Sequence, residues 1–94
     1  MFAQVARFKT KKDSWKNVEN EIMNFRNLLR AKRIPIKQEI VLHNRDHNTW
    51  IAIALFDSVS DLEEGSKHRD TQELLEKVKP HVDGDIELFW SEVF

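Results

Sequence analysis

The stretch Thr49–Phe56, TWIAIALF, constrains the fold of this chain more than any other. Only its first residue is polar, and that residue is β-branched. On a strand, successive side chains point to opposite faces. Two apolar sets result: Ile51, Ile53 and Leu55 on one face, and Trp50, Ala52, Ala54 and Phe56 on the other. Because both faces are apolar, the stretch predicts a central strand that is buried on both sides.

The rest of the chain supplies three further strands and two helical regions. An apolar stripe with helical spacing follows Asp13 and Ser14, either of which is a suitable helix cap. A second helix is expected to start at Ser60, to break around Gly65 and Ser66, and to resume near Asp70. The stripe of the first helix is formed by Trp15, Val18, Ile22, Phe25 and Leu29, and the other predicted strands cover residues 2–9, 36–43 and 86–94.

This order, βαββαβ, predicts an α+β ferredoxin-like fold in which both helices cover the same face of one antiparallel sheet. The chain has no further helix to cover the second face of the sheet, although the central and last strands are apolar on both sides. A second copy, packed sheet against sheet around a two-fold axis, is the simplest cover. We therefore expect a homodimer.

Size and composition limit the remaining possibilities. Ninety-four residues fit one domain, residues 1–94, and the absence of cysteine excludes disulfides and thiolate metal sites. No apolar run approaches the roughly 18 residues of a membrane span, and the first residues lack a signal-peptide pattern. We expect a cytoplasmic protein that does not bind membranes. His43 and His47 are four residues apart but fall on a predicted strand end and turn, so we predict no metal site.

Charge is distributed unevenly along the chain. Residues 1–48 hold 11 Lys/Arg against 5 Asp/Glu, and residues 49–94 hold 4 against 11. Either the basic half forms a nucleic-acid surface, or the two halves interleave in space and neutralise each other. RNA-recognition modules share the βαββαβ order, but they carry exposed aromatic residues within a Gly-containing basic pattern on their strands. The central strand has neither glycine nor basic residues, so we favour interleaving and predict no nucleic-acid partner.

Several local strings resemble the dimeric α+β barrel superfamily, and within it the antibiotic biosynthesis monooxygenase-like domains. The strand around Val5–Lys11 is similar to the family's opening strand, and Leu55–Ser58 resembles the end of its third strand. Ser66–His68, followed by Leu74, Leu75 and Pro80, is similar to its broken second helix. The resemblance covers nearly the whole chain and implies a dimeric α+β barrel.

The same resemblance implies possible activities. Family members include cofactor-free monooxygenases acting on quinol-like aromatic compounds, haem-degrading monooxygenases, and proteins without a known reaction. The haem-degrading members use an Asn on strand one and a Trp at the end of strand three. This chain has no Asn on its first strand and Phe56 at the Trp position, and His68 lies earlier in the helix than the haem ligand would. We therefore expect no haem and no other cofactor.

Candidate substrate-binding residues come mainly from the central strand. Ala52 and Ala54, between the rings of Trp50 and Phe56, either leave a hollow for a flat apolar ligand or make room for large side chains such as Trp90 or Phe94. Arg7 would position an oxygenated substrate if its face of the strand is interior, and would be solvated on the outer face. The sequence does not decide which face this is.

His68 is the candidate catalytic residue, because a histidine at the mouth of such a pocket can take a proton from a phenolic substrate. Its alternative is an exposed histidine in a charged segment. Two functions follow from the sequence. One is a cofactor-independent monooxygenase-like protein acting on a small aromatic or quinol-type compound. The other is a non-catalytic homodimeric ligand-binding or structural module of the same fold.

Overall fold

The computed structural model describes all residues from Met1 to Phe94 and has the predicted element order. The second helical region is divided into two helices, and a single 3-10 turn follows them. The elements are β1 (Phe2–Lys9), α1 (Trp15–Lys32), β2 (Gln38–Asn44), β3 (Thr49–Phe56), α2 (Val59–Lys67), α3 (Arg69–Val78), η1 (Lys79–His81) and β4 (Glu87–Glu92).

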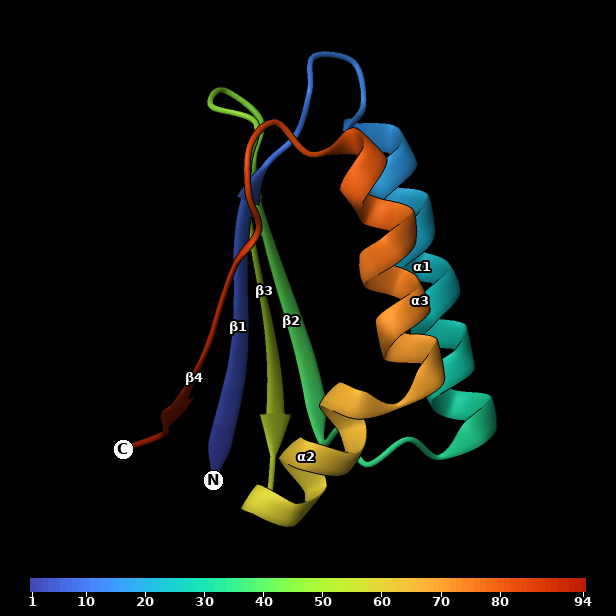
Figure 1. Cartoon of the computed structure of the whole chain (residues 1–94), viewed down its shortest axis with the longest axis vertical. Helices are drawn as coiled ribbons and strands as arrows, with labels where there is room; N and C mark the ends of the chain where they lie inside the picture. The colour runs from blue at the N-terminus through green and yellow to red at the C-terminus, as the bar shows by residue number, and fades with distance from the viewer.

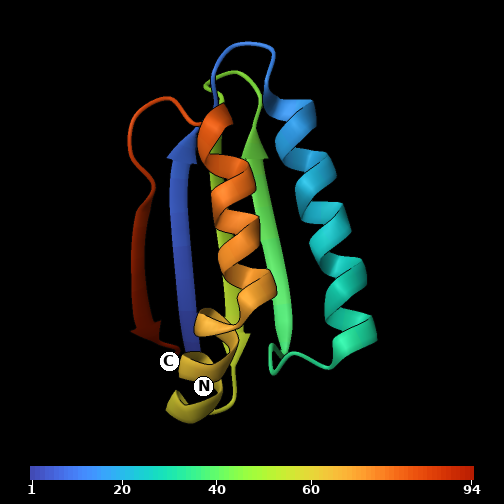
Figure 2. The same cartoon turned by 45° about the vertical axis from the view of Figure 1, so that its right-hand side comes forward.

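The four strands form one antiparallel sheet in the order β2-β3-β1-β4. The helices lie on one side of this sheet, with α1 and α3 side by side and α2 across its lower end (Figures 1 and 2). The predicted α+β ferredoxin-like βαββαβ fold is therefore confirmed, and so is the position of β3 inside the sheet. The last strand is shorter than predicted, since it ends at Glu92.

Helix α1 follows the predicted apolar stripe. Val18, Ile22 and Phe25 are buried, and the last turn carries Arg30 and Lys32, whose charge suits the helix C-terminus.

The predicted side-chain cap at the start of α1 is absent. Ser14 occupies the N-cap position, but its side chain accepts no capping hydrogen bond.

The boundaries of the second helical region also differ from the prediction. Helix α2 begins after Ser58, whose hydroxyl oxygen accepts from the amide of Asp61 at 3.1 Å, rather than at Ser60. The break falls at His68, while Gly65 lies inside α2. A Cβ atom at Gly65 would stand 2.6 Å from Cε1 of Phe56, so glycine here allows α2 to approach the end of β3 closely.

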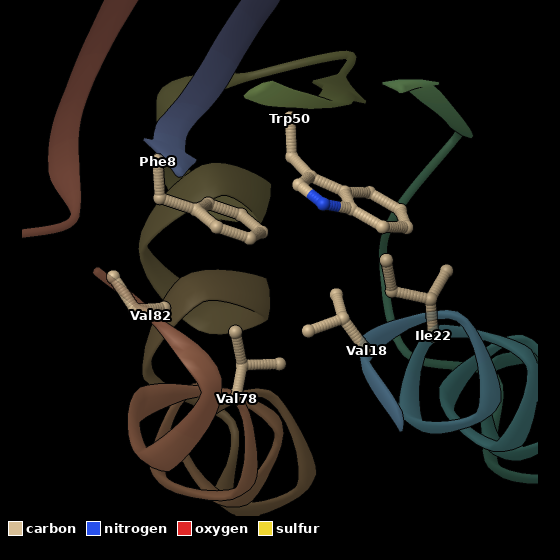
Figure 3. Packing of buried hydrophobic residues seen from close by; sticks show 6 residues of the cluster. All are labelled: Phe8, Val18, Ile22, Trp50, Val78 and Val82. Atoms are coloured by element: carbon tan, nitrogen blue, oxygen red, sulfur yellow. The ribbon is translucent and has the colours of Figure 1, made fainter. Parts of the chain in front are cut away.

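The core fills the upper end of the space between the sheet and the helices. Phe8 and Trp50 point from β1 and β3 toward the valines and Ile22 that come from α1, α3 and the segment after η1 (Figure 3). The rings of Phe8 and Trp50 are nearly parallel, with centroids 6.1 Å apart, and the imidazole of His43 stacks on Trp50 at 3.8 Å. The indole N–H of Trp50 donates to Thr10 Oγ1 at 3.3 Å, which satisfies the buried polar group.

The register of the sheet assigns each side chain to a face. The face toward the helices carries Phe8, Trp50 and Phe56, all buried, together with alternate residues of β2 that include Glu39 and Val41. The outer face carries the other set. Its apolar members are Ala3, Val5, Ile40, Leu42, Ile51, Ile53, Leu55 and Phe89.

The uneven charge of the two halves is partly neutralised in space. Three ion pairs each join a cation of the first half to a carboxylate of the second: Arg7 to Glu87 at 2.7 Å, Lys32 to Asp70 at 2.9 Å, and Lys37 to Asp57 at 3.0 Å. These pairs support the interleaved interpretation. None of the helices is long and apolar enough to cross a membrane.

Asp70 gives a test of how α3 is held against α1. The side chain of Asp70 is 4% exposed, and the hydrogen bond from Lys32 holds the pKa of its carboxyl below the ordinary value of 3.8. Because the folded pKa is lowered, this pair stabilises the fold fully above the unfolded pKa, and the stabilisation is lost as pH falls through the folded pKa. Asp70→Asn should lower the free energy of unfolding at pH 7 and reduce its decline below about pH 4.

Urea unfolding followed by circular dichroism at pH 7 and at pH 3 measures both effects. Asp57→Asn is the matched control, because Asp57 and its partner Lys37 are both more than half exposed. Equal stability losses for the two variants at pH 7, or an unchanged pH dependence in Asp70→Asn, would contradict this account of Asp70.

Candidate functional site

An apolar cavity of about 270 Å³ lies between the sheet and the three helices. Its walls combine the middle of the sheet, one side of α1, and the inner sides of α2 and α3. Fifteen of its 22 lining residues are hydrophobic. Among them are Ala6, Val41, Ala52, Ala54, Phe56, Leu74, Leu75 and Leu88.

The cavity exists because the middle of the sheet carries small side chains. Ala6 on β1 is paired with Ala52 on β3, and Ala54 follows on the same face. Large rings stand at both ends, with Phe8 and Trp50 above and Phe56 below. The rings hold the helices away from the sheet, and the alanines are too short to fill the space that remains.

The hollow is not filled by the large side chains that a packed interior would need. Trp90 is 58% exposed and Phe94 is fully exposed, so neither enters the space over the alanines. Of the two interpretations that the sequence left open for Ala52 and Ala54, the structure favours the hollow.

Polar groups at the wall of the cavity belong to two places. Where α2 meets α3, the Thr71 hydroxyl donates to the Gly65 carbonyl at 2.7 Å, and the Gln72 amide donates to the Ser66 carbonyl at 2.7 Å. These bonds join the two helices and shape the lower wall. On the sheet, the polar lining residues are Gln4 and Glu39.

Glu39 is the acidic residue of the cavity wall, and its side chain is 12% exposed. Its Oε1 accepts from the Nε of Arg26 at 3.1 Å, and its Oε2 is buried without a partner. Burial raises the pKa of Glu39 above its ordinary value, although the charge and hydrogen bond of Arg26 act in the opposite direction. A carboxyl group in this setting can accept a proton or a hydrogen bond from a molecule in the cavity.

Three of the predicted substrate-binding residues line this cavity, namely Ala52, Ala54 and Phe56. Trp50 shares their face of the strand but lies among the core side chains at the upper end, stacked between Phe8 and His43. We expected Trp50 to line the substrate pocket, but its ring stacking and its hydrogen bond to Thr10 make it part of the packed core.

Arg7 lies on the outer face of β1, away from the cavity, and its guanidinium pairs with Glu87 across the sheet at 2.7 Å. Of the two positions that the sequence allowed for it, the structure gives the outer one. The strand parity that decides this follows from Phe8, whose ring is drawn into the core and leaves Arg7 on the opposite side.

His68 stands at the junction of α2 and α3, next to the cavity but not among its lining residues. Its Nδ1 accepts from the amide of Asp70 at 3.2 Å, so the imidazole caps α3. It also lies 3.7 Å from the Asp70 carboxylate. His68 therefore does not face the cavity as a base for the substrate would.

Glu39 and Gln4 were missed from the sequence. In β2 the apolar residues Ile40 and Leu42 face outward, and Glu39 faces the helices. The sequence does not show which side of β1 faces the helices, and through the strand pairing this choice decides which side of β3 and β2 does so. Burial lowers the pKa of His43, which stacks on Trp50. No group of three His, Asp or Glu side chains is placed to bind a metal ion.

Comparison with known proteins supports the fold independently. No protein-family model and no curated protein matches the sequence. Among solved structures, the "putative antibiotic biosynthesis monooxygenase" of Caulobacter crescentus aligns with a TM-score of 0.84 at 11% identity, covering 99% of this chain and 89% of that chain. The protein Rv0793 of Mycobacterium tuberculosis aligns with a TM-score of 0.82 at 13% identity, covering 99% and 94%.

A Nitrosomonas europaea protein with the same description as the Caulobacter protein aligns with a TM-score of 0.80 at 10% identity, over 99% of this chain and 98% of its own. The predicted resemblance to antibiotic biosynthesis monooxygenase-like domains is thus confirmed as a shared fold over nearly the full length of both chains. At such low identity, the likeness concerns the fold and does not identify a reaction.

Proposed function

We propose that this chain is a cofactor-independent monooxygenase-like protein that binds a small aromatic or quinol-type compound in the cavity over Ala52 and Ala54. The observation that carries the proposal is the cavity itself: about 270 Å³, mostly apolar, and bordered by a few polar groups on the sheet and where α2 meets α3. Three structurally similar proteins described as monooxygenases support the same assignment.

The proposed chemistry asks little of the protein. A base removes a proton from an electron-rich hydroxylated ring, and the resulting anion reduces dioxygen. One oxygen atom enters the substrate and the other leaves as water. The substrate supplies all four electrons that reduce dioxygen, and it loses the two hydrogen atoms that the water carries away. The chain contributes an apolar cavity that excludes water and a group that accepts the first proton.

We also propose that the protein works as a homodimer joined through the outer face of the sheet. Ile40, Leu42 and Phe89 are 37%, 53% and 45% exposed in the single chain, on a face that no helix covers. All residues of β4 are exposed as well, since this edge strand extends beyond the helices. A second copy placed against this face would bury Ile40, Leu42 and Phe89, whereas Leu88 and Trp90 of β4 point to the side of the helices.

Oxygen uptake with substituted hydroquinones and anthrones tests the enzymatic proposal. Wild-type protein should increase oxygen consumption by at least one member of this panel, and Ala54→Phe should reduce the increase at least tenfold, because its ring would occupy the cavity. Ala31→Phe is the control, since Ala31 is exposed near the end of α1 and lies outside the cavity.

Binding of these compounds without oxygen uptake would instead favour the non-catalytic ligand-binding module. If Ala54→Phe binds the compounds as tightly as wild type does, the cavity is not the binding site. Melting temperatures of both variants show whether the changes leave the fold intact.

The dimer is tested by placing a charge on the outer face. Ile40→Asp should convert the dimer into a monomer at micromolar concentration, because a carboxylate would lose its hydration in the interface. Light scattering coupled to size-exclusion chromatography measures the mass. Asn27→Asp, with the same charge change on the exposed side of α1, should leave the mass unchanged. A wild-type protein of single-copy mass would contradict the proposal.

A further inference from the structure

We propose that Glu39 is the ligand anchor of the cavity: its carboxyl group accepts a hydrogen bond from the hydroxyl group of a phenol- or hydroquinone-class ligand and takes that proton when the ligand reacts. This inference rests on the proposed function and adds to it a polar contact, a proton acceptor and a required feature of the ligand.

The register of the sheet places Glu39 beside Ala54 on the cavity floor, on the edge strand β2. Ala54 on β3 is paired with Glu39 on one side and with Gln4 on the other. Because neighbouring strands lie about 4.8 Å apart, a flat ring over Ala54 would lie within reach of both polar side chains. The alanine provides the space, and the two flanking residues provide the hydrogen-bonding groups.

The two oxygens of the Glu39 carboxyl have different surroundings. Oε1 accepts from Arg26 Nε at 3.1 Å, which fixes the orientation of the carboxyl group. The same guanidinium directs Nη1 toward Met23 Sδ at 3.7 Å rather than toward the second oxygen. Oε2 is left buried and unpartnered. A buried carboxyl oxygen without a donor is costly, so a carboxyl group that turns toward the cavity and accepts from a ligand O–H group would remove that cost.

The placement of a carboxyl on this side of β2 also opposes the usual burial pattern. The same strand turns Ile40 and Leu42 outward, where they are 37% and 53% exposed, and turns Glu39 toward the helices. A strand that served packing alone would have the reverse arrangement. The outward set is accounted for by the proposed dimer, and the inward carboxyl is accounted for by a ligand.

These surroundings select the chemical class of the ligand. The mostly apolar wall favours a flat hydrocarbon ring system. Lys67 also lines the cavity, from the end of α2, but over Ala54 the carboxyl of Glu39 would repel a ligand carboxylate or phosphate placed beside it. The remaining requirement is a neutral hydrogen-bond donor, which a phenolic hydroxyl supplies. In the proton transfer, the ligand O–H bond breaks, its electron pair stays on the ligand oxygen, and a new O–H bond forms at a carboxyl oxygen of Glu39. Burial, which raises the pKa of Glu39, makes this carboxyl a better acceptor of the proton than an exposed one.

Calorimetric titration with 1-naphthol and with 1-methoxynaphthalene tests the anchor, since the two probes share one ring system and only the first has an O–H group. Wild-type protein should bind 1-naphthol about tenfold more tightly than its methyl ether, the effect of one hydrogen bond to a charged acceptor. Glu39→Gln should remove most of this preference while binding the ether within about twofold of wild type. Glu87→Gln, a change of the same type on the exposed outer face, should keep the preference.

The outcomes separate the anchor from the proposed function. If wild type binds both probes with equal affinity, or if Glu39→Gln keeps the preference, Glu39 is not the anchor although the cavity binds aromatic compounds. If wild type binds neither probe, the aromatic-ligand function fails and the anchor fails with it. Should Glu39→Gln not fold, Glu39→Ala takes its place in the comparison, and equal affinity of wild type for the two probes overturns the anchor without any variant. Loss of both probes in Ala54→Phe locates their binding in the cavity.

Discussion

The spacing between the sheet and its helices is the constraint on which the rest of this structure depends. Phe8 and Trp50 at one end and Phe56 at the other stand between the two layers, and the alanines between them leave the middle open. Close-packed interiors normally fill such space with side chains from the opposite layer. Here the helices are held at a distance set by the rings, and at the lower end Gly65 lets α2 approach Phe56 and close the cavity.

The same sheet underlies both the proposed dimer and the proposed ligand site. Its helix-facing side holds a cavity with a carboxyl group in the wall, and its outer side presents aliphatic and aromatic side chains to solvent. Both features follow from one alternation of side chains along the strands. The outer face explains the proposed dimer, and the inner face explains the proposed ligand. A one-residue shift in the register of β2 would exchange the two roles.

The fold could be predicted from the sequence because its strongest signals are local. The apolar run of β3, the stripe of α1 and the order of the elements were enough, and the bounds of β1 and β3 were matched. The site was harder, because it depends on which side of each strand faces the helices. Ala52, Ala54 and Phe56 could be grouped from the sequence because they lie on one face of one strand, whereas the sides taken by Arg7 and Glu39 depend on pairing between distant segments. His68 lies at the helix break, as expected, but its Nδ1 accepts from the amide of Asp70 and caps α3, a local hydrogen bond that the sequence pattern did not indicate.

Diffraction from crystals held under xenon pressure tests the central claim most directly, because xenon enters apolar cavities without needing a hydrogen bond. If the rings hold the layers apart as described, xenon density should appear over Ala52 and Ala54, between the sheet and α3. A structure in which side chains fill that space and no xenon binds there would contradict the account.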